Sequence, residues 1–410
     1  MPSLLKSGSF VTVRRLRAYS LMLLAGYALA IGALLASADG IVDAWGRPLG
    51  TDFANVYAAG RMAQEGNAAL AYDWPAHRAV QQAVSGRADI PYYGWHYPPV
   101  FLFLATVLAL FPYLAALFLY QALSLAAYVH VVRRIAGHAQ AYLLALAFPA
   151  VFINVTHGHN GFVTAALLGG ALLVLDRRPA IAGMLIGFLV YKPQFGVLIP
   201  LVLVATARWR TFAAAVTTVA VLCALTWLAF GTDVWIAFWR SLPLTQKIIL
   251  EDGSTGFYKI QSVFAALRLM GAPVGIAYAG QLATMGTVAV TLVLLWRSSA
   301  AFPLKAAALL IGSLLATPYA LDYDLVLLAP AIAFLAAHGL REGFTPYEVS
   351  GLVALWALPL AARTIGAATL VPLAAPVMLA MFFLILRRAG TIDTLAAWRG
   401  PAAVLARLRP

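Results

Sequence analysis

A carboxylate and a guanidinium stand close together in the segment TDFANVYAAGR, where Asp52 precedes Arg61 by nine positions. This segment lies in the first polar interval after a hydrophobic N-terminal stretch. A carboxylate can take a proton as a general base, and an arginine can bind an anion through its fork of N–H donors. The alternative interpretation is that Asp52 caps a helix beginning at Phe53, because Asp is favoured at that position.

A lysine interrupts a later apolar stretch, in the order Lys192, Pro193, Gln194. A charged side chain near the centre of a membrane span costs roughly 2.5 to 3.5 kcal/mol on insertion scales. Lys192 and Gln194 are therefore candidate site residues, because a helix broken by proline is tolerated where it lines a cavity. Alternatively, the lysine extends to the membrane interface or offsets the dipole of a helix end.

Two polar turns carry further candidates. The turn TPYALDYD contains Asp322 and Asp324, and the turn HGHN contains His157, His159 and Asn160. The two acids could also be simple loop residues at the membrane surface. Two histidines separated by one residue are a weak metal signal, so we expect the HGHN turn to hydrogen-bond a polar ligand.

Composition identifies the kind of protein that must position these groups. The chain has 410 residues, of which 63% are hydrophobic and 10% charged, whereas soluble proteins average about 25% charged residues. Apolar runs recur to the C-terminus, which predicts an all-α polytopic membrane protein with one membrane domain over residues 1–410. The net charge of +13 comes from basic clusters between the runs, a pattern of membrane orientation and not of nucleic-acid binding. The single cysteine, Cys223, excludes an intrachain disulfide and a cysteine-based metal site.

The first span is predicted at residues 18–38, which leaves residues 39–97 on the outside as a long first loop. A signal peptide cleaved before Asp39 is the alternative, because a small-residue A-x-A pattern precedes that residue. Within this loop, residues 53–66 and 75–84 have the composition of short amphipathic helices lying at the membrane interface.

The remaining apolar runs predict about 12 spans in total. They fall near residues 139–156, 160–176, 180–207 as two short halves, 211–230, 273–296, 303–316, 324–339, 347–362 and 367–386, with residues 98–132 in addition. Residues 98–132 are either a hairpin or one broken span, and a hairpin would move the HGHN and KPQ turns to the cytoplasmic side. A second outer loop is predicted at residues 231–260, and a short basic tail ends the chain.

Four segments, taken in order, resemble glycosyltransferase family 87. They are TDFANVYAAGRMAQEGNAALAYD, HYPPVFLFLATVLALFP, HGHNGFVTAALLGGALLVLDRRPAIAGMLIGFLVYKPQFGVLIPLVL and TPYALDYDLVLLAP. The resemblance covers most of the chain and implies a bundle of the GT-C class. It also implies a polyprenyl-phosphate-linked sugar donor, expected to carry mannose, and chemistry on the periplasmic side of a bacterial inner membrane. The acceptor would be a glycolipid or a glycan of the cell envelope.

The same resemblance implies that Asp52 is the catalytic acid of a D-F-x-x-x-Y-x-A-G-R motif, with Tyr57 and Arg61 completing the pattern. Relatives commonly carry histidine in the turn that here reads LDYD, so Tyr323 or Asp324 stands where an imidazole is expected.

Sugar transfer with inversion needs a base for the acceptor hydroxyl and cations for the leaving phosphate. Asp52 would be the base, and the phosphate candidates are Arg61, Lys192 and Lys259. Candidates for binding the sugar or acceptor are Tyr57, His96, His157, His159, Asn160, Gln194, Gln261, Asp322 and Asp324. No cofactor and no dedicated metal site is required, although some enzymes of this class use a divalent cation.

Two other functions fit parts of the sequence. Broken helices and charges within the membrane are also natural in a transporter or flippase for a lipid-linked or small polar substrate. A transporter often has two related halves, but the KPQ break has no clear partner elsewhere in the chain. A non-catalytic scaffold for envelope assembly is the third interpretation. The long outer loop carrying Asp52 favours the enzyme.

Overall fold

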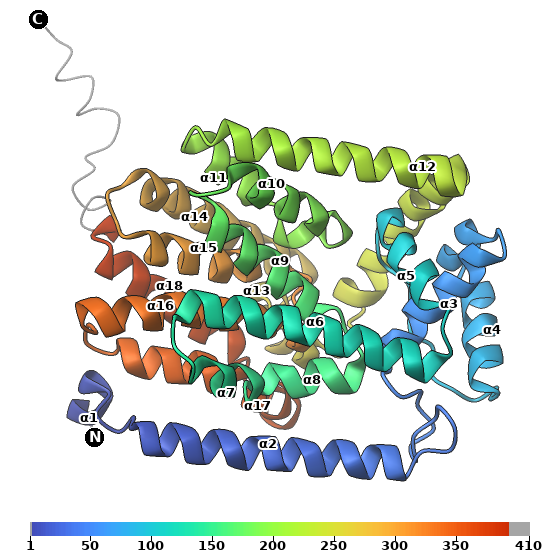
Figure 1. Ribbon diagram of the computed structural model, residues 1–410, viewed down its shortest axis with the longest axis horizontal. Coiled ribbons are helices and arrows are strands. Elements are labelled where there is room, and N and C mark those ends of the chain that lie inside the picture. The colour runs from blue at the N-terminus through green and yellow to red at the C-terminus, as the bar shows by residue number, and fades with distance from the viewer. Residues whose placement is uncertain (1, 393–410) are drawn as a thin grey trace, which may run out of the picture.

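The computed structural model describes residues 2–392, which fold into one bundle of helices (Figure 1). Within this part of the chain the only β-pairing is three isolated bridges. The basic tail expected at the C-terminus falls largely beyond residue 392 and lies outside the described residues.

Among residues 2–392, six helices are long and apolar enough to cross a membrane, so the predicted multi-pass, all-α membrane protein is confirmed, whereas the predicted number of about 12 spans is not. They are α2 (Val13–Ala36), α6 (Tyr113–Ala136), α12 (Trp209–Gln246) with the π-turn η5 (Lys247–Glu251), α14 (Val274–Arg297), η7 (Asp322–Leu327) with α16 (Leu328–Glu342), and α17 (Glu348–Thr369).

Shorter helices fill the space between these long ones. They are α1 (Pro2–Ser7), α7 (Ala141–Leu146), α8 (Pro149–His157), α9 (Gly161–Val174), α10 (Pro179–Phe188), η3 (Leu189–Tyr191), η4 (Pro193–Phe195), α11 (Ile199–Ala205), α13 (Val263–Leu269), α15 (Phe302–Ala316) and α18 (Ala374–Arg388). The break predicted at the KPQ sequence is present, because Lys192 separates η3 from η4.

The expected first loop contains α3 (Phe53–Gln64), η1 (Ala68–Tyr72) and α4 (Trp74–Ser85). The side chain of Asp73 caps α4 through the backbone N–H of Ala76 at 2.9 Å, and Gly86 ends the helix in the left-handed conformation. Helix α3 is not a surface helix, because most of its residues are buried.

The region 98–132 consists of η2 (Pro99–Phe101), the short helix α5 (Leu102–Leu108) and the long helix α6. Helix α5 packs on α3 at Gly60, where any larger side chain would collide with the backbone oxygen of Ala105. Only α6 is long enough to cross the membrane here, which favours the single broken span over the hairpin.

The second predicted loop, residues 231–260, is helical as far as Glu251. A break does occur at the expected start of the loop, because Gly231 has a φ of 79° and interrupts the regular helix. The polar composition of this interval suggested a loop, but the helix continues beyond the glycine. The remaining residues lead through η6 (Phe257–Lys259) to α13.

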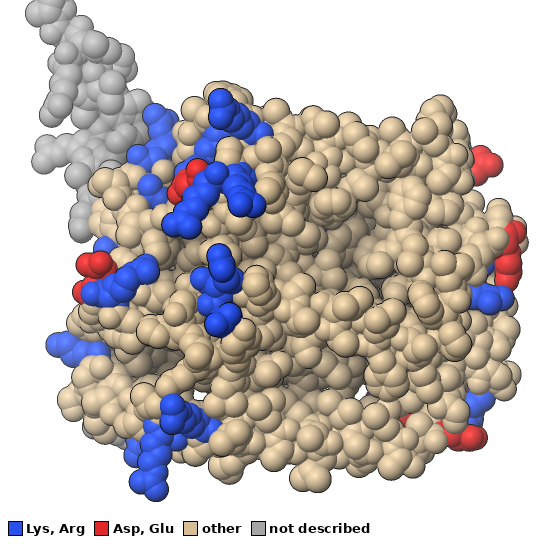
Figure 2. Space-filling model, viewed as in Figure 1, with Lys and Arg blue, Asp and Glu red and all other residues tan. Residues whose placement is uncertain are grey.

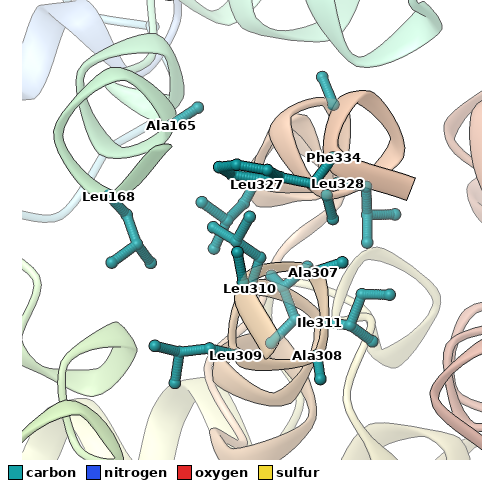
Figure 3. Close-up of a cluster of buried hydrophobic side chains, with 14 of the residues drawn as sticks. Ala165, Leu168, Ala307, Ala308, Leu309, Leu310, Ile311, Leu327, Leu328 and Phe334 are labelled. Atoms are coloured by element: carbon teal, nitrogen blue, oxygen red, sulfur yellow. The ribbon is translucent and has the colours of Figure 1, made fainter. Parts of the chain in front are cut away.

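The main hydrophobic core surrounds α15, which lies between α9, α14 and α16 (Figures 1 and 3). Figure 3 shows Leu309 and Leu310 of α15 in one cluster with Leu168 of α9 and Leu327 at the end of η7. Every residue of α15 from Ala306 to Ala316 is buried, as expected for a helix that is apolar on all sides. This helix therefore fixes the position of the polar turn that follows it.

Charged residues are unevenly distributed between the two ends of the bundle. Figure 2 shows most lysine and arginine side chains of the visible face at the end where α2 begins and α6 ends. We call this the basic end. The opposite end carries α3 and α4 and has both acidic and basic side chains.

Candidate active site

Asp52 lies at the start of α3 and is only partly exposed. Its backbone N–H donates to the carbonyl oxygen of His157 at 2.9 Å, which joins the start of α3 to the end of α8. The carboxylate does not cap its own helix and forms no hydrogen bond or ion pair with any residue of the described chain. The proposed base is therefore available to a ligand, and the cap interpretation finds no support.

The contact between α3 and α8 depends on the glycine of the HGHN turn. Gly158 ends α8 in the left-handed conformation, with a φ of 61°. A side chain at this position would collide with Phe53 and Leu117. Glycine therefore allows the two helix ends to approach each other and brings Asp52 beside the HGHN turn.

Several charged groups act on the Asp52 carboxyl. Removal from solvent by the surrounding protein raises its pKa above the ordinary value of 3.8, and the nearby Asp322 carboxylate raises it further. His157, Lys192 and Lys259 lower it. The net direction is upward, which suits a carboxyl that must accept a proton from a hydroxyl.

Lys192 and Asp324 form a buried ion pair, with Nζ 2.7 Å from Oδ1. The other carboxylate oxygen of Asp324 accepts the backbone N–H of Leu321 at 3.0 Å. The ammonium also lies over the ring of Tyr323, 5.4 Å from its centroid. The structure thus joins the KPQ break to the LDYD turn, two segments that are far apart in the sequence.

Asp322 pairs with Arg363 of α17, with Oδ2 2.9 Å from Nη1. The same Nη1 lies 3.5 Å from Nε2 of His157. Sequence reasoning missed Arg363. The available signal was an isolated arginine in the apolar stretch between Leu358 and Leu370, beside the end of a predicted span.

His159 and Asn160 are buried and lack partners for some of their polar atoms. The His159 ring stacks on Tyr323 with centroids 3.4 Å apart, and its Nε2 lies 3.3 Å from the hydroxyl of Tyr97. Its Nδ1 has no hydrogen-bond partner within the described chain, and neither has the Asn160 side-chain amide. Such groups are rare in folded proteins unless a ligand or water completes them.

Lys259 and Gln261 border this cluster. Lys259 is partly exposed, forms no ion pair with the described residues and acts electrostatically on Asp52. The Gln261 amide is buried and donates to the carbonyl oxygen of Tyr258 at 2.9 Å. Gln194 is partly exposed at the KPQ break, without a hydrogen bond to the described part of the chain.

Three predicted site residues lie elsewhere or are occupied by structural contacts. Arg61 is exposed and pairs with Glu65 at 3.5 Å. The Tyr57 hydroxyl donates to the carbonyl oxygen of Phe111 at 2.9 Å. His96 bonds the hydroxyl of Thr245 at 2.9 Å, and burial lowers its pKa to about 4. None of the three forms a hydrogen bond or an ion pair with Asp52.

The described residues contain no group of three or more His, Cys, Asp or Glu side chains arranged to hold a metal ion. The site therefore consists of one unpaired carboxylate, two ion pairs and a set of unpartnered polar atoms. It can accept a proton, bind an anion and hydrogen-bond a polyhydroxylated ligand.

Comparison with models of protein families identifies the family of this chain. The family model of glycosyltransferase family 87 matches residues 95–318, more than half of the chain. This range includes the HGHN turn, the KPQ break and Lys259, but not Asp52, Asp322 or Arg363. No curated protein and no solved structure matches the chain.

Proposed function

Because the chain belongs to glycosyltransferase family 87, we propose that it transfers a sugar from a polyprenyl-phosphate carrier to a glycolipid or glycan acceptor. The expected sugar is mannose, and the expected site of transfer is the periplasmic face of a bacterial inner membrane. The observation that carries this proposal is the unpaired Asp52 carboxylate. It lies beside His157, within electrostatic reach of Asp322, Lys192 and Lys259.

The reaction is a single displacement at the anomeric carbon. The acceptor hydroxyl oxygen forms the new bond to this carbon while the bond to the phosphate oxygen breaks, and Asp52 takes the hydroxyl proton. The polyprenyl phosphate leaves with the electron pair of the broken bond and gains one negative charge. Cations near the phosphate stabilise that charge as it develops.

The unpartnered atoms near Asp52 suit a sugar. His159 Nδ1 and the Asn160 amide can exchange hydrogen bonds with sugar hydroxyls, and burial makes leaving them unsatisfied costly, at about 1 to 3 kcal/mol per group. His157, Gln194, Gln261 and the two LDYD acids border the same region. In this arrangement Lys192 would hold the LDYD turn in position through its ion pair with Asp324.

The charge distribution supports the orientation. Basic residues next to membrane spans favour the cytoplasmic side, and they gather at the basic end (Figure 2). Asp52 and the α3–α4 region would then face the periplasm. Thiol labelling in intact cells tests this: in a Cys223→Ser background, Ala88→Cys should react and Ser299→Cys should be protected. The reverse pattern contradicts the orientation.

The function itself is tested with purified protein in lipid nanodiscs. We expect consumption of polyprenyl-phosphate mannose, followed by mass spectrometry of the lipid, and no consumption of a nucleotide-linked mannose. Parallel reactions with polyprenyl-phosphate glucose and arabinose define the sugar. Use of the nucleotide-linked donor alone would contradict the proposal.

A further inference from the structure

Arg363 uses only part of its hydrogen-bonding capacity. Its Nη1 is bound to Asp322 and close to His157, whereas Nε and Nη2 have no hydrogen bond or ion pair with residues 2–392. The side chain as a whole is 36% exposed, so it is not sealed inside the bundle. A guanidinium held at one nitrogen presents the others in a fixed geometry that suits phosphate oxygens.

Lys192 is less suited to bind the phosphate. Its side chain is 5% exposed, and its charge is neutralised by Asp324 at 2.7 Å. If the ammonium turned to a phosphate, Asp324 would remain buried without its partner, which is unfavourable. We therefore assign Lys192 a positioning role in holding the LDYD turn.

Lys259 belongs to η6, which packs against α17, the helix that carries Arg363. Its neighbour Tyr258 packs against Gly366, which lies one helical turn after Arg363. A small cavity between η6 and α17 is lined by Tyr258, Ala362 and Gly366 together with Gln261. Lys259 and Arg363 do not line this cavity themselves, but each follows directly in sequence a residue that does, Tyr258 and Ala362.

We propose that Arg363, together with Lys259, binds the phosphate of the lipid carrier and stabilises it as the leaving group. This assignment rests on the proposed function. Arg363 forms no ion pair with Asp52, but it contacts Asp322 and His157, which both act on Asp52. Such a separation suits an inverting transfer, because the base and the leaving phosphate act on opposite faces of the sugar. Asp322 orients the guanidinium.

The test compares the binding of polyprenyl phosphate with that of uncharged polyprenol, using the full chain in nanodiscs. Arg363→Gln should weaken polyprenyl phosphate binding by about tenfold or more and leave polyprenol binding unchanged. The double variant Arg363→Gln/Asp322→Asn should behave in the same way, because it removes the cation without leaving a buried acid unpaired. Arg363→Lys should recover part of the affinity. Arg87→Gln, which alters an exposed arginine paired with Asp89, is the control and should change neither affinity.

The outcomes separate this assignment from the proposed function. If Arg363→Gln weakens both lipids equally, the residue acts on structure and the assignment is overturned. If the wild type transfers sugar and Arg363→Gln keeps its affinity for polyprenyl phosphate, the phosphate binds elsewhere while the proposed function survives. A wild type that binds both lipids equally and consumes no polyprenyl-phosphate sugar overturns both.

Discussion

The two ends of the bundle treat their charged groups differently. At the basic end, Glu348 pairs with Arg388, and Asp176 pairs with Arg208. Lys305 donates to the carbonyl oxygens of Trp296 and Ser298.

At the Asp52 end, a partly buried carboxylate has no partner among the described residues, and neither has the buried Asn160 amide. The interactions named at the basic end hold helix ends in place. At the Asp52 end, Lys192 and Asp322 also have ion-pair partners, but Asp52 and the Asn160 amide are left for a ligand to complete.

The largest expected effect comes from making the same Asp→Asn substitution at each of the two ends and comparing the transfer rates. Asp52→Asn removes the proposed base, and sugar transfer should fall by about a thousandfold, because general-base catalysis contributes roughly 10² to 10⁴. Asp176→Asn makes the same chemical change at the basic end and should leave the rate unaltered. The measurement is transfer of radiolabelled sugar at equal amounts of folded protein. Retained activity in Asp52→Asn would assign the base to another residue.

The second effect concerns stability. Lys192→Met leaves Asp324 buried without its partner and should destabilise the fold by about 3 to 5 kcal/mol. The double variant Lys192→Met/Asp324→Leu should recover most of that loss, because the orphaned acid is gone. Breaking the more exposed pair with Arg208→Gln should cost about 0 to 1 kcal/mol. Thermal unfolding in detergent measures the stability of all three variants. Equal losses in Lys192→Met and in the double variant would show that the unpaired Asp324 carboxylate is not the cause of the destabilisation.

A third effect distinguishes binding groups from structural ones. Asn160→Ala removes two buried polar groups that lack partners, so thermal stability should stay constant or rise. Transfer should fall by about tenfold, because hydrogen bonds to the sugar are lost. A fall in stability would show instead that the amide supports the fold.

The smallest effect is a shift in pH dependence. Asp52 must be ionised to act, so the transfer rate should fall as pH decreases through a pKa above 3.8. Asp322 raises that pKa, so Asp322→Asn should move the acid limb to lower pH. His157 lowers it, so His157→Gln should move the limb to higher pH. Rates measured against pH for the three proteins check these signs, and shifts in the same direction would contradict them.

Much of the helical framework could be predicted, because apolar runs between basic clusters mark spans directly. The predicted segments 273–296 and 303–316 coincide closely with α14 and α15, and the KPQ break was recognised from its proline. The structure of the interval 231–260 is harder to predict, because the polar residues of a lengthened helix have the same composition as a loop. Only the backbone of Gly231 distinguishes the two.

The candidate site was predictable in its turns but not in its pairings. Lys192 meets Asp324 and Asp322 meets Arg363 across long sequence separations, and a single sequence contains no signal for such contacts. Arg61 illustrates the limit of motif reasoning. Nine residues along a helix place it about 13 Å from Asp52 along the axis and on the opposite face.

The short helices around the core have a consequence for the fate of the donor. At about 1.5 Å per residue, α9 and α15 are roughly 21 to 23 Å long, whereas α6 reaches about 36 Å and the hydrocarbon core measures about 30 Å. The HGHN turn precedes α9, and the LDYD turn follows α15, so both turns stand at the ends of helices that are shorter than the hydrocarbon core is thick. In the proposed reaction, a sugar donor bound between these two turns would be partly shielded from water by the longer helices around them, which would disfavour its hydrolysis.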